Sequence, residues 1–203
     1  MTAVQAKRIV ASVLFCDIKN FTSLFDEKDP VEAFAFANYV LSSLSKIIID
    51  YGGTVDKLMG DGILAHFGII NPCEDHAIKA CNCCLKLLDE IWNINCTRYS
   101  LNQMTISIGV GLNSGEVVYG KITAGNYEEY SIYGDVVNTV TRIEQMTRYL
   151  SVDILVSKSI VNLCENNFEF CDVGKYELKG KKGVHQLYWL LPINPIKNAS
   201  GNL

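Results

Sequence analysis

The spacing of hydrophobic residues changes along the chain between patterns typical of strands and patterns typical of helices. Residues 8–18 form an apolar, β-branched run with little alternation, which predicts a central strand that is covered on at least one face. From Pro30 the apolar positions recur at steps of three and four residues, which predicts a helix that ends before Gly52 and Gly53. Its expected buried stripe comprises Phe34, Ala37, Val40, Leu41, Leu44, Ile47 and Ile48.

The middle of the chain predicts a hairpin, a second helix and two more strands. Two short apolar stretches, residues 54–59 and 63–67, are joined by Gly60, Asp61 and Gly62, as in a β-hairpin. Residues 104–112 alternate strictly and predict a strand, and residues 115–122 predict a second one. Residues 74–94 follow a helical pattern, with an inner face of Ile78, Cys81, Leu85, Leu88 and Trp92.

The last third completes an α+β arrangement. A brief strand is expected at residues 130–133, and Asp135 is well placed to cap a helix that reaches about residue 149. A strand at 152–156, a short helix at 157–163 and a hairpin of residues 175–178 and 186–191 follow. Residues 192–203 form a polar tail compatible with disorder. Strand, helix, hairpin, helix, strand is the order of a ferredoxin-like (βαββαβ) α+β sandwich with helices on one sheet face, here extended by a C-terminal helix and hairpin. We expect one domain over residues 1–191.

Composition narrows the classes of protein that fit. The chain has 203 residues, of which 49% are hydrophobic, so it can bury a real core. Its formal net charge of −4 provides no basic field for a nucleic-acid backbone. We find no run of about 20 apolar residues that could span a bilayer and no convincing export signal. We therefore expect a cytoplasmic domain without nucleic-acid partners or direct membrane insertion, cut from a longer membrane-tethered or sensor-linked parent.

The eight cysteines do not indicate a metal site. Cys81, Cys83 and Cys84 are crowded together, and Cys73 precedes His76 by three residues, but no second pair of ligands stands at a zinc-like distance. Without an export signal a disulfide framework is not expected. The favoured interpretation is reduced thiols that act as small hydrophobes on a helix.

Two aspartates carry the first candidate chemistry. Asp17 ends the first expected strand, and Asp61 lies in the hairpin turn. If the strand and the hairpin are neighbours in the sheet, both carboxylates gather at one edge, where they would repel each other and raise one another's pKa. Divalent cations remove that penalty. Taken alone, however, Asp17 is more often a helix cap and Asp61 more often a turn residue.

Two later segments make the pattern specific. Residues 108–120 read I-G-V-G-L-N-S-G-E-V-V-Y-G, and residues 130–142 read Y-S-I-Y-G-D-V-V-N-T-V-T-R. Together with F-C-D-I-K-N-F-T and K-L-M-G-D-G, they make the chain resemble the class III nucleotidyl cyclases, the adenylate and guanylate cyclase catalytic domains. The resemblance runs from about Ile9 to Trp189. It implies a homodimer with two sites at the interface, each with metal-binding aspartates from one chain and substrate-binding residues from the other.

The resemblance assigns the metal ligands and the groups that contact the ribose and the α-phosphate. Asp17, Asp61 and the backbone carbonyl of Ile18 match the ligands of two divalent ions, Mg²⁺ or Mn²⁺. Asn138 and Arg142 match the pair that positions the ribose and stabilises the transition state at the α-phosphate. Their spacing of four residues puts both on one helix face, although a solvated polar stripe would fit the same spacing.

It also assigns the rest of the substrate site. Lys179 matches the lysine that contacts the β- and γ-phosphates, whereas Lys181 and Lys182 are expected to be surface residues. Lys57 matches a position that holds lysine in adenylate cyclases and glutamate in guanylate cyclases. Ser131 matches the second base-reading position, and as a donor and an acceptor it discriminates less sharply than aspartate.

The sequence thus predicts an adenylate cyclase that converts ATP to 3′,5′-cyclic AMP and pyrophosphate. Ser131 is nearest to the threonine-bearing branch of the family, for which regulation by bicarbonate is a hypothesis. Glu116 stands where some relatives carry an arginine, and it is expected to face solvent. No general base is evident, since His66, His76 and His185 lie outside the matching motifs. The alternatives are a guanylate or mixed-specificity cyclase and a silent nucleotide-binding module; a diguanylate cyclase fits less well because its Gly-Gly-Asp/Glu-Glu-Phe turn is missing.

Overall fold

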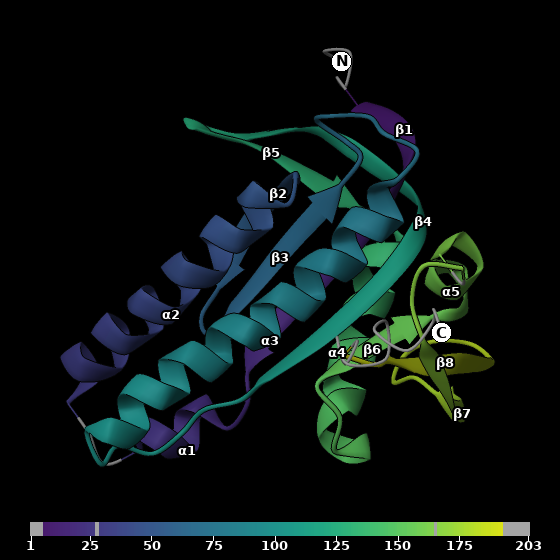
Figure 1. Cartoon of the computed structure of the whole chain (residues 1–203). Helices are drawn as coiled ribbons and strands as arrows, with labels where there is room; N and C mark the ends of the chain where they lie inside the picture. Colours follow the sequence, from purple (N-terminus) through teal and green to yellow (C-terminus); the bar gives the residue numbers. More distant parts are fainter. Residues whose placement is uncertain (1–5, 27–28, 165, 193–203) are drawn as a thin grey trace, which may run out of the picture.

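The computed structural model describes residues 6–26, 29–164 and 166–192, and the C-terminal tail expected at 192–203 lies outside them except for Pro192. One sheet has the strand order β2-β3-β1-β4-β6-β8-β7, and β5 pairs with β4 (Figure 1). The strands are β1 (Ala6–Ile18), β2 (Gly53–Met59), β3 (Gly62–Phe67), β4 (Ile108–Ala124), β5 (Tyr127–Tyr133), β6 (Ile154–Ser157), β7 (Phe170–Glu177) and β8 (Val184–Leu190). The helices are α1 (Phe21–Phe25), α2 (Pro30–Asp50), α3 (His76–Ser100), α4 (Asp135–Leu150) and α5 (Lys158–Cys164).

The first half of the chain confirms the ferredoxin-like prediction. Strands β2, β3, β1 and β4 are neighbours in that order, and each pair is antiparallel. Helices α2 and α3 lie in front of this part of the sheet in Figure 1. Their apolar side chains pack on the residues of β1 and β4 that point to the same face, among them Leu14, Cys16, Ile108 and Val110.

Helix α4 corrects the expectation that the helices share one face of the sheet. Val140 of α4 packs with Ala11 and Val13 of β1, whose side chains point away from the core that holds α2 and α3. Two glycines of β4 let α4 lie close to the sheet. A Cβ at Gly109 would stand 2.4 Å from the side chains of Glu144 and Thr147, and one at Gly111 would stand 2.5 Å from the Val140 carbonyl oxygen.

Strand β4 is continuous where two strands were expected. It pairs with β1 from Gly120 opposite Ala6 to Ile108 opposite Ile18, and residues 104–107 stay outside it. Asn113 and Ser114, which lie between the two expected strands, are buried, and the Ser114 hydroxyl donates to the Ala11 carbonyl at 3.1 Å. Because their polar groups have partners inside the fold, the strand does not need to end there.

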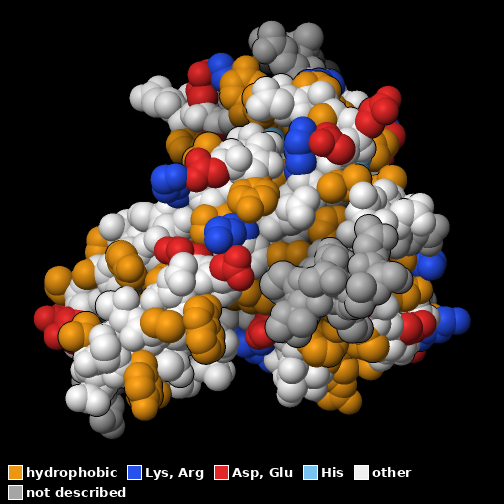
Figure 2. Space-filling model, in the orientation of Figure 1, with side chains coloured by type: hydrophobic (Ala, Val, Ile, Leu, Met, Phe, Trp, Pro, Cys, Tyr) orange, Lys and Arg blue, Asp and Glu red, His pale blue; other side chains and the backbone are white. Residues whose placement is uncertain are grey.

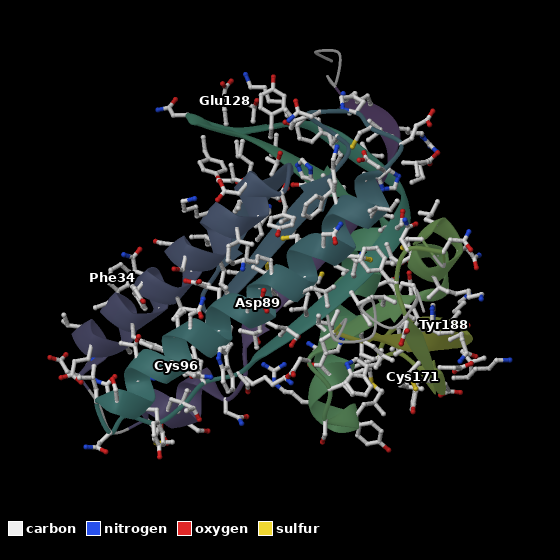
Figure 3. All side chains as sticks on the ribbon, viewed as in Figure 1. Phe34, Asp89, Cys96, Glu128, Cys171 and Tyr188 are labelled. Carbon is white, nitrogen blue, oxygen red and sulfur yellow. The ribbon has the colours of Figure 1, made fainter. Side chains whose placement is uncertain are left out.

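Helix α3 keeps its predicted position but not its full predicted inner face. Trp92 is 71% exposed, and Phe34 of α2, which lies on the outer side of its helix in Figure 3, is 74% exposed. The buried face of α3 holds Cys81, as predicted, and also Cys83 and Cys84, as expected for cysteines used as small hydrophobes. Figure 2 shows the outward apolar side chains of α2 and α3 scattered among polar ones.

Among the described residues, α2 is the one helix whose length and composition would allow it to cross a membrane, with a mean hydropathy of 1.2. Val40, Leu41, Leu44 and Ile48 nevertheless form a buried stripe that packs in the core beside β1 and β3. Asp29 caps the helix by accepting a hydrogen bond from the Val31 N–H at 3.0 Å.

Candidate active site

The fold brings Asp17 and Asp61 together. Asp17 pairs with Gly62 across β1 and β3, and the N–H of Ile18 donates to the Asp61 carbonyl at 3.3 Å. Burial raises the pKa of Asp61, and the nearby charge of Asp17 raises it further. Asp17 caps no helix, because the N-cap of α1 is Asn20. The cap interpretation of Asp17 is therefore wrong, and the two aspartates repel each other as the sequence suggested.

These groups fit a divalent cation. Two crowded carboxylates and a backbone carbonyl are oxygen ligands of the kind that Mg²⁺ and Mn²⁺ take. A Cβ at Gly62 would stand 3.3 Å from Asp17 Oδ1 and 2.9 Å from the Phe15 ring, so the glycine keeps room for the carboxylate. Within the described part of the chain no three His, Cys, Asp or Glu side chains gather in a metal-binding group. The remaining ligands would therefore come from phosphate oxygens and water.

Arg148 and Glu144 belong to the same end of the sheet, and the sequence reasoning missed both. Arg148 donates to Asp17 Oδ2 at 2.6 Å and to Glu144 Oε1 at 2.7 Å. The Glu144 side chain is 1% exposed, and burial raises its pKa to about 7 although Arg148 opposes the shift. The spacing of four residues between an acidic and a basic side chain was the available signal.

A second group of candidate residues surrounds a cavity of about 580 Å³ at the other end of α4. Asn138 and Arg142 line it from the helix, and Lys179 lines it from the turn between β7 and β8. Within the described residues the Lys179 side chain has no hydrogen-bond or ion-pair partner. His185, which the motifs did not include, lines the same cavity, and its Nε2 is buried without a partner among the described residues. The amide of Asn138 and the cationic side chains of Arg142 and Lys179 thus line one open space, which would suit phosphate groups.

Lys181 corrects a further expectation. Its side chain is only 12% exposed, and its ammonium group contacts the Asp135 carboxylate and donates to the Asp135 carbonyl at 3.3 Å. Lys181 therefore ties the turn that carries Lys179 to the first residue of α4. Asp135 is not the expected N-cap, since Gly134 holds that position. Lys182 is exposed, as expected.

The two groups do not meet within one chain. Asn138 lines the cavity at the N-terminal half of α4, whereas Arg148, ten residues later, contacts Asp17. At a rise of 1.5 Å per residue, ten residues separate these positions by about 15 Å along the helix. A single chain therefore holds the aspartates and the cavity at opposite ends of α4.

The two candidate base-reading residues lie where β2 meets β5. Lys57 Nζ stands 2.9 Å from Glu129 Oε1 and 3.6 Å from Asp56 Oδ2. Burial lowers the pKa of Lys57, but the hydrogen bond to Glu129 and the charge of Asp56 outweigh it and raise the pKa overall. Ser131 is fully buried, and its hydroxyl donates to Asp56 Oδ2 at 2.8 Å.

Asp56 is the residue here that sequence patterns could not find. A register shift in β2 between Val55 and Lys57 places Asp56 in a bulge, so its side chain leaves the alternation of the strand. The carboxylate is 1% exposed and accepts a second hydrogen bond from the Ile132 N–H at 3.1 Å.

The other residues singled out in the sequence lie outside these groups. Glu116 faces solvent, as expected, and pairs with Arg8 at 2.8 Å on the surface. His76 is hydrogen-bonded to Ser12 at 2.8 Å in the interior. Burial lowers the pKa of both His66 and His76, which favours neutral rings.

The family model described as "Adenylate and Guanylate cyclase catalytic domain" matches residues 4–192. The chain belongs to this family. It is 33% identical over 181 residues to an adenylate cyclase of Anabaena cylindrica, covering 87% of this chain and 36% of that protein. The chain thus spans about a third of the length of this relative, and domains of the family typically form dimers within longer chains.

Solved structures show the same fold. The adenylyl cyclase CyaB of P. aeruginosa aligns with a TM-score of 0.86 at 25% identity, covering 95% of this chain and 98% of that one. The guanylyl cyclase Cya2 aligns with a TM-score of 0.86 at 26% identity, covering 96% and 98%. Overall likeness therefore shows a nucleotide cyclase and does not separate adenylate from guanylate cyclases.

Proposed function

We propose that this chain is the catalytic domain of an adenylate cyclase, which converts ATP to 3′,5′-cyclic AMP and pyrophosphate. The observation that carries the choice of ATP is the pair of groups at the junction of β2 and β5. Lys57 offers an ammonium donor, which suits an acceptor nitrogen of adenine, whereas guanine presents N–H groups at the corresponding edge. Ser131 donates its hydroxyl proton to Asp56, so its free lone pairs suit the adenine amino group.

The reaction is an in-line attack of the ribose 3′-hydroxyl on the α-phosphorus. A new bond forms between the 3′ oxygen and the α-phosphorus, the bond from the α-phosphorus to the bridging oxygen breaks, and pyrophosphate leaves with the bonding electrons. The hydroxyl proton passes to water, since no side chain is placed as an evident base. Asn138 orients the ribose, Arg142 donates to the α-phosphate as charge shifts, and Lys179 holds the β- and γ-phosphates.

Asp17, Asp61 and the carbonyl of Ile18 would hold two divalent ions, Mg²⁺ or Mn²⁺. Bound there, these ions would activate the 3′-hydroxyl and neutralise the triphosphate. The role of the chain itself is to keep two carboxylates at one edge of the sheet with Gly62 leaving space beside them.

A homodimer would complete the site. The aspartates and the cavity lie at opposite ends of α4, so a substrate that needs both would take them from two copies. Two equivalent sites would then form, each with the aspartates of one copy and Lys57, Ser131, Asn138, Arg142 and Lys179 of the other. Placement in a longer, regulated parent chain and a cytoplasmic location remain predictions.

Product identification tests the activity. The purified domain is incubated with ATP or GTP and with Mg²⁺ or Mn²⁺, and the products are separated and identified by mass. We expect cyclic AMP and pyrophosphate in equal amounts. Absence of any cyclic nucleotide under all four conditions would favour the silent nucleotide-binding module.

A cyclase of mixed or guanylate specificity is the second candidate. Its support is the equal structural likeness to CyaB and to Cya2. A ratio of cyclic GMP to cyclic AMP near or above one at equal substrate concentrations would establish it. The bicarbonate hypothesis is tested in the same assay, and a rate unchanged by bicarbonate at fixed pH would remove it.

A further inference from the structure

Asp56 lies behind the base-reading residues and has three polar neighbours. It accepts hydrogen bonds from the Ser131 hydroxyl at 2.8 Å and from the Ile132 N–H at 3.1 Å, and Lys57 Nζ stands 3.6 Å away. Its side chain is 1% exposed, so water does not compete for these bonds. A buried carboxylate with this set of donors is held in one orientation.

We infer that Asp56 is a positioning residue that fixes the polarity of the Ser131 hydroxyl and thereby selects adenine over guanine. This inference rests on the proposed function. A serine hydroxyl can donate or accept, but an ionised carboxylate can only accept. Ser131 must therefore point its proton at Asp56 and present lone pairs on its other side.

The lone pairs of Ser131 discriminate at position 6 of a purine. Adenine carries an amino group there and can donate to Ser131, whereas guanine carries a carbonyl oxygen. The Ser131 lone pairs and the guanine oxygen would then face each other in a buried place with no donor between them, which is the arrangement that rejects a substrate most strongly.

Access to Ser131 involves Glu129. Ser131 is fully buried in the single chain, so a purine can reach it only if a neighbouring side chain moves. Glu129 lies two residues earlier on the same side of β5 and holds Lys57 at 2.9 Å. A purine that reaches Ser131 would therefore displace Glu129 from Lys57.

The substitution Asp56→Asn inverts the polarity of Ser131. The Ile132 N–H cannot reverse, so the amide oxygen of the new side chain must face it. The amide NH₂ then faces Ser131 and donates to it. The serine proton is turned outward, where it can donate to the guanine oxygen and no longer accepts from the adenine amino group.

The test compares kcat/KM for ATP and for GTP in four full-length variants. We expect Asp56→Asn to lower the ATP-to-GTP ratio about tenfold. Glu128→Gln is the control, because it removes a negative charge from the same strand at a side chain that pairs with Lys121 and not with Lys57, and it should leave the ratio unchanged. In a Ser131→Ala background, Asp56→Asn should have no further effect on the ratio.

The inference is overturned if Glu128→Gln changes the ratio as much as Asp56→Asn, or if the effect of Asp56→Asn persists without the serine. Should Asp56→Asn fail to fold, Ser131→Ala alone decides. It should lower ATP use about tenfold without lowering GTP use, and an equal loss for both nucleotides would refute the inference.

Binding separates this inference from the proposed function. Affinities of 3′-deoxy-ATP and 3′-deoxy-GTP, which lack the attacking hydroxyl, give the same ratio without turnover. If the wild type forms no cyclic nucleotide, the proposed function fails. The inference about Asp56 is then supported if the affinity ratio changes in Asp56→Asn and not in Glu128→Gln, and it is refuted if the ratio stays the same in Asp56→Asn.

Discussion

The two ends of α4 differ in charge and in how completely their side chains are paired. At the C-terminal end, Arg148 already bridges Asp17 and Glu144. At the N-terminal end, Arg142 and Lys179 line an open cavity. The helix dipole adds partial positive charge at the first turn of α4 and partial negative charge at the last turn. The first turn therefore favours anions, and the last turn favours cations. One end of α4 thus presents carboxylates and the other presents cationic side chains, and under the proposed function one substrate would use both only across two chains.

Complementation between two inactive variants is the strongest test of a site that takes residues from both ends of α4 in two different copies. Asp61→Ala removes a carboxylate from one end, and Asn138→Ala removes a polar group from the other. Each variant alone should lose about 10²- to 10³-fold in kcat. An equal mixture should recover about a quarter of wild-type activity, because half of randomly formed dimers are heterodimers with one intact site of two. The rate of cyclic AMP formation measures this.

The control for complementation is a mixture of Asp61→Ala with Asp17→Ala. Both changes fall at the same end of α4, so no heterodimer gains an intact site and activity should stay at background. Recovery in this control, or no recovery in the first mixture although heterodimers form, would contradict a site shared between two copies.

The pairing at the C-terminal end is tested by pH. Burial raises the pKa of Glu144 from 4.5 to about 7, so the folded chain binds this proton more tightly than the unfolded chain does. Its contribution to stability is therefore complete below about pH 4.5 and is lost as the pH rises to about 7. Relative to Glu144→Gln, the wild type should lose about 3 kcal/mol of unfolding free energy across this window.

Urea denaturation of both proteins in EDTA, at a series of pH values, measures that difference. Glu169→Gln, which changes an exposed carboxylate just before β7, controls for a general effect of charge. A difference between wild type and Glu144→Gln that is independent of pH, or that grows in the other direction, would show that Arg148 keeps Glu144 ionised throughout.

The open end is tested by substitutions in the turn between β7 and β8. Lys179→Ala should lower kcat/KM for ATP about tenfold, because it removes a charge-assisted contact to the triphosphate. Lys182→Ala changes an exposed lysine of the same turn, which also lines the cavity but matches no residue of the family's site, and it should have an effect of less than about twofold. Steady-state kinetics at several ATP concentrations measures both. Equal effects of the two substitutions would mean that only the overall charge of the turn matters.

Sequence patterns predicted those features of the two groups of side chains that follow from local structure, such as strand ends, turns and the spacing along a helix. A strand end and a hairpin turn sufficed to bring Asp17 and Asp61 together, because the hairpin folds back beside β1. The helical spacing placed Asn138 and Arg142 on one face. Gly109 and Gly111, however, do not show in the sequence alone that α4 packs against them, because the residues that they face are far away along the chain. Asp56 was missed because a bulge removes it from the alternation, and Lys181 because its partner Asp135 is 46 residues away in the sequence.

The smallest expected effect belongs to Glu116, which lies on neither end of α4. It forms a surface ion pair with Arg8 at 2.8 Å, and both side chains are more than half exposed. Such pairs contribute about 0–1 kcal/mol because water and salt screen them. Glu116→Ala should therefore leave kcat/KM within about twofold of the wild type and change the unfolding free energy by less than about 0.5 kcal/mol. Cyclase kinetics and urea denaturation measure the two quantities, and a loss of activity without a loss of stability would place Glu116 in the active site.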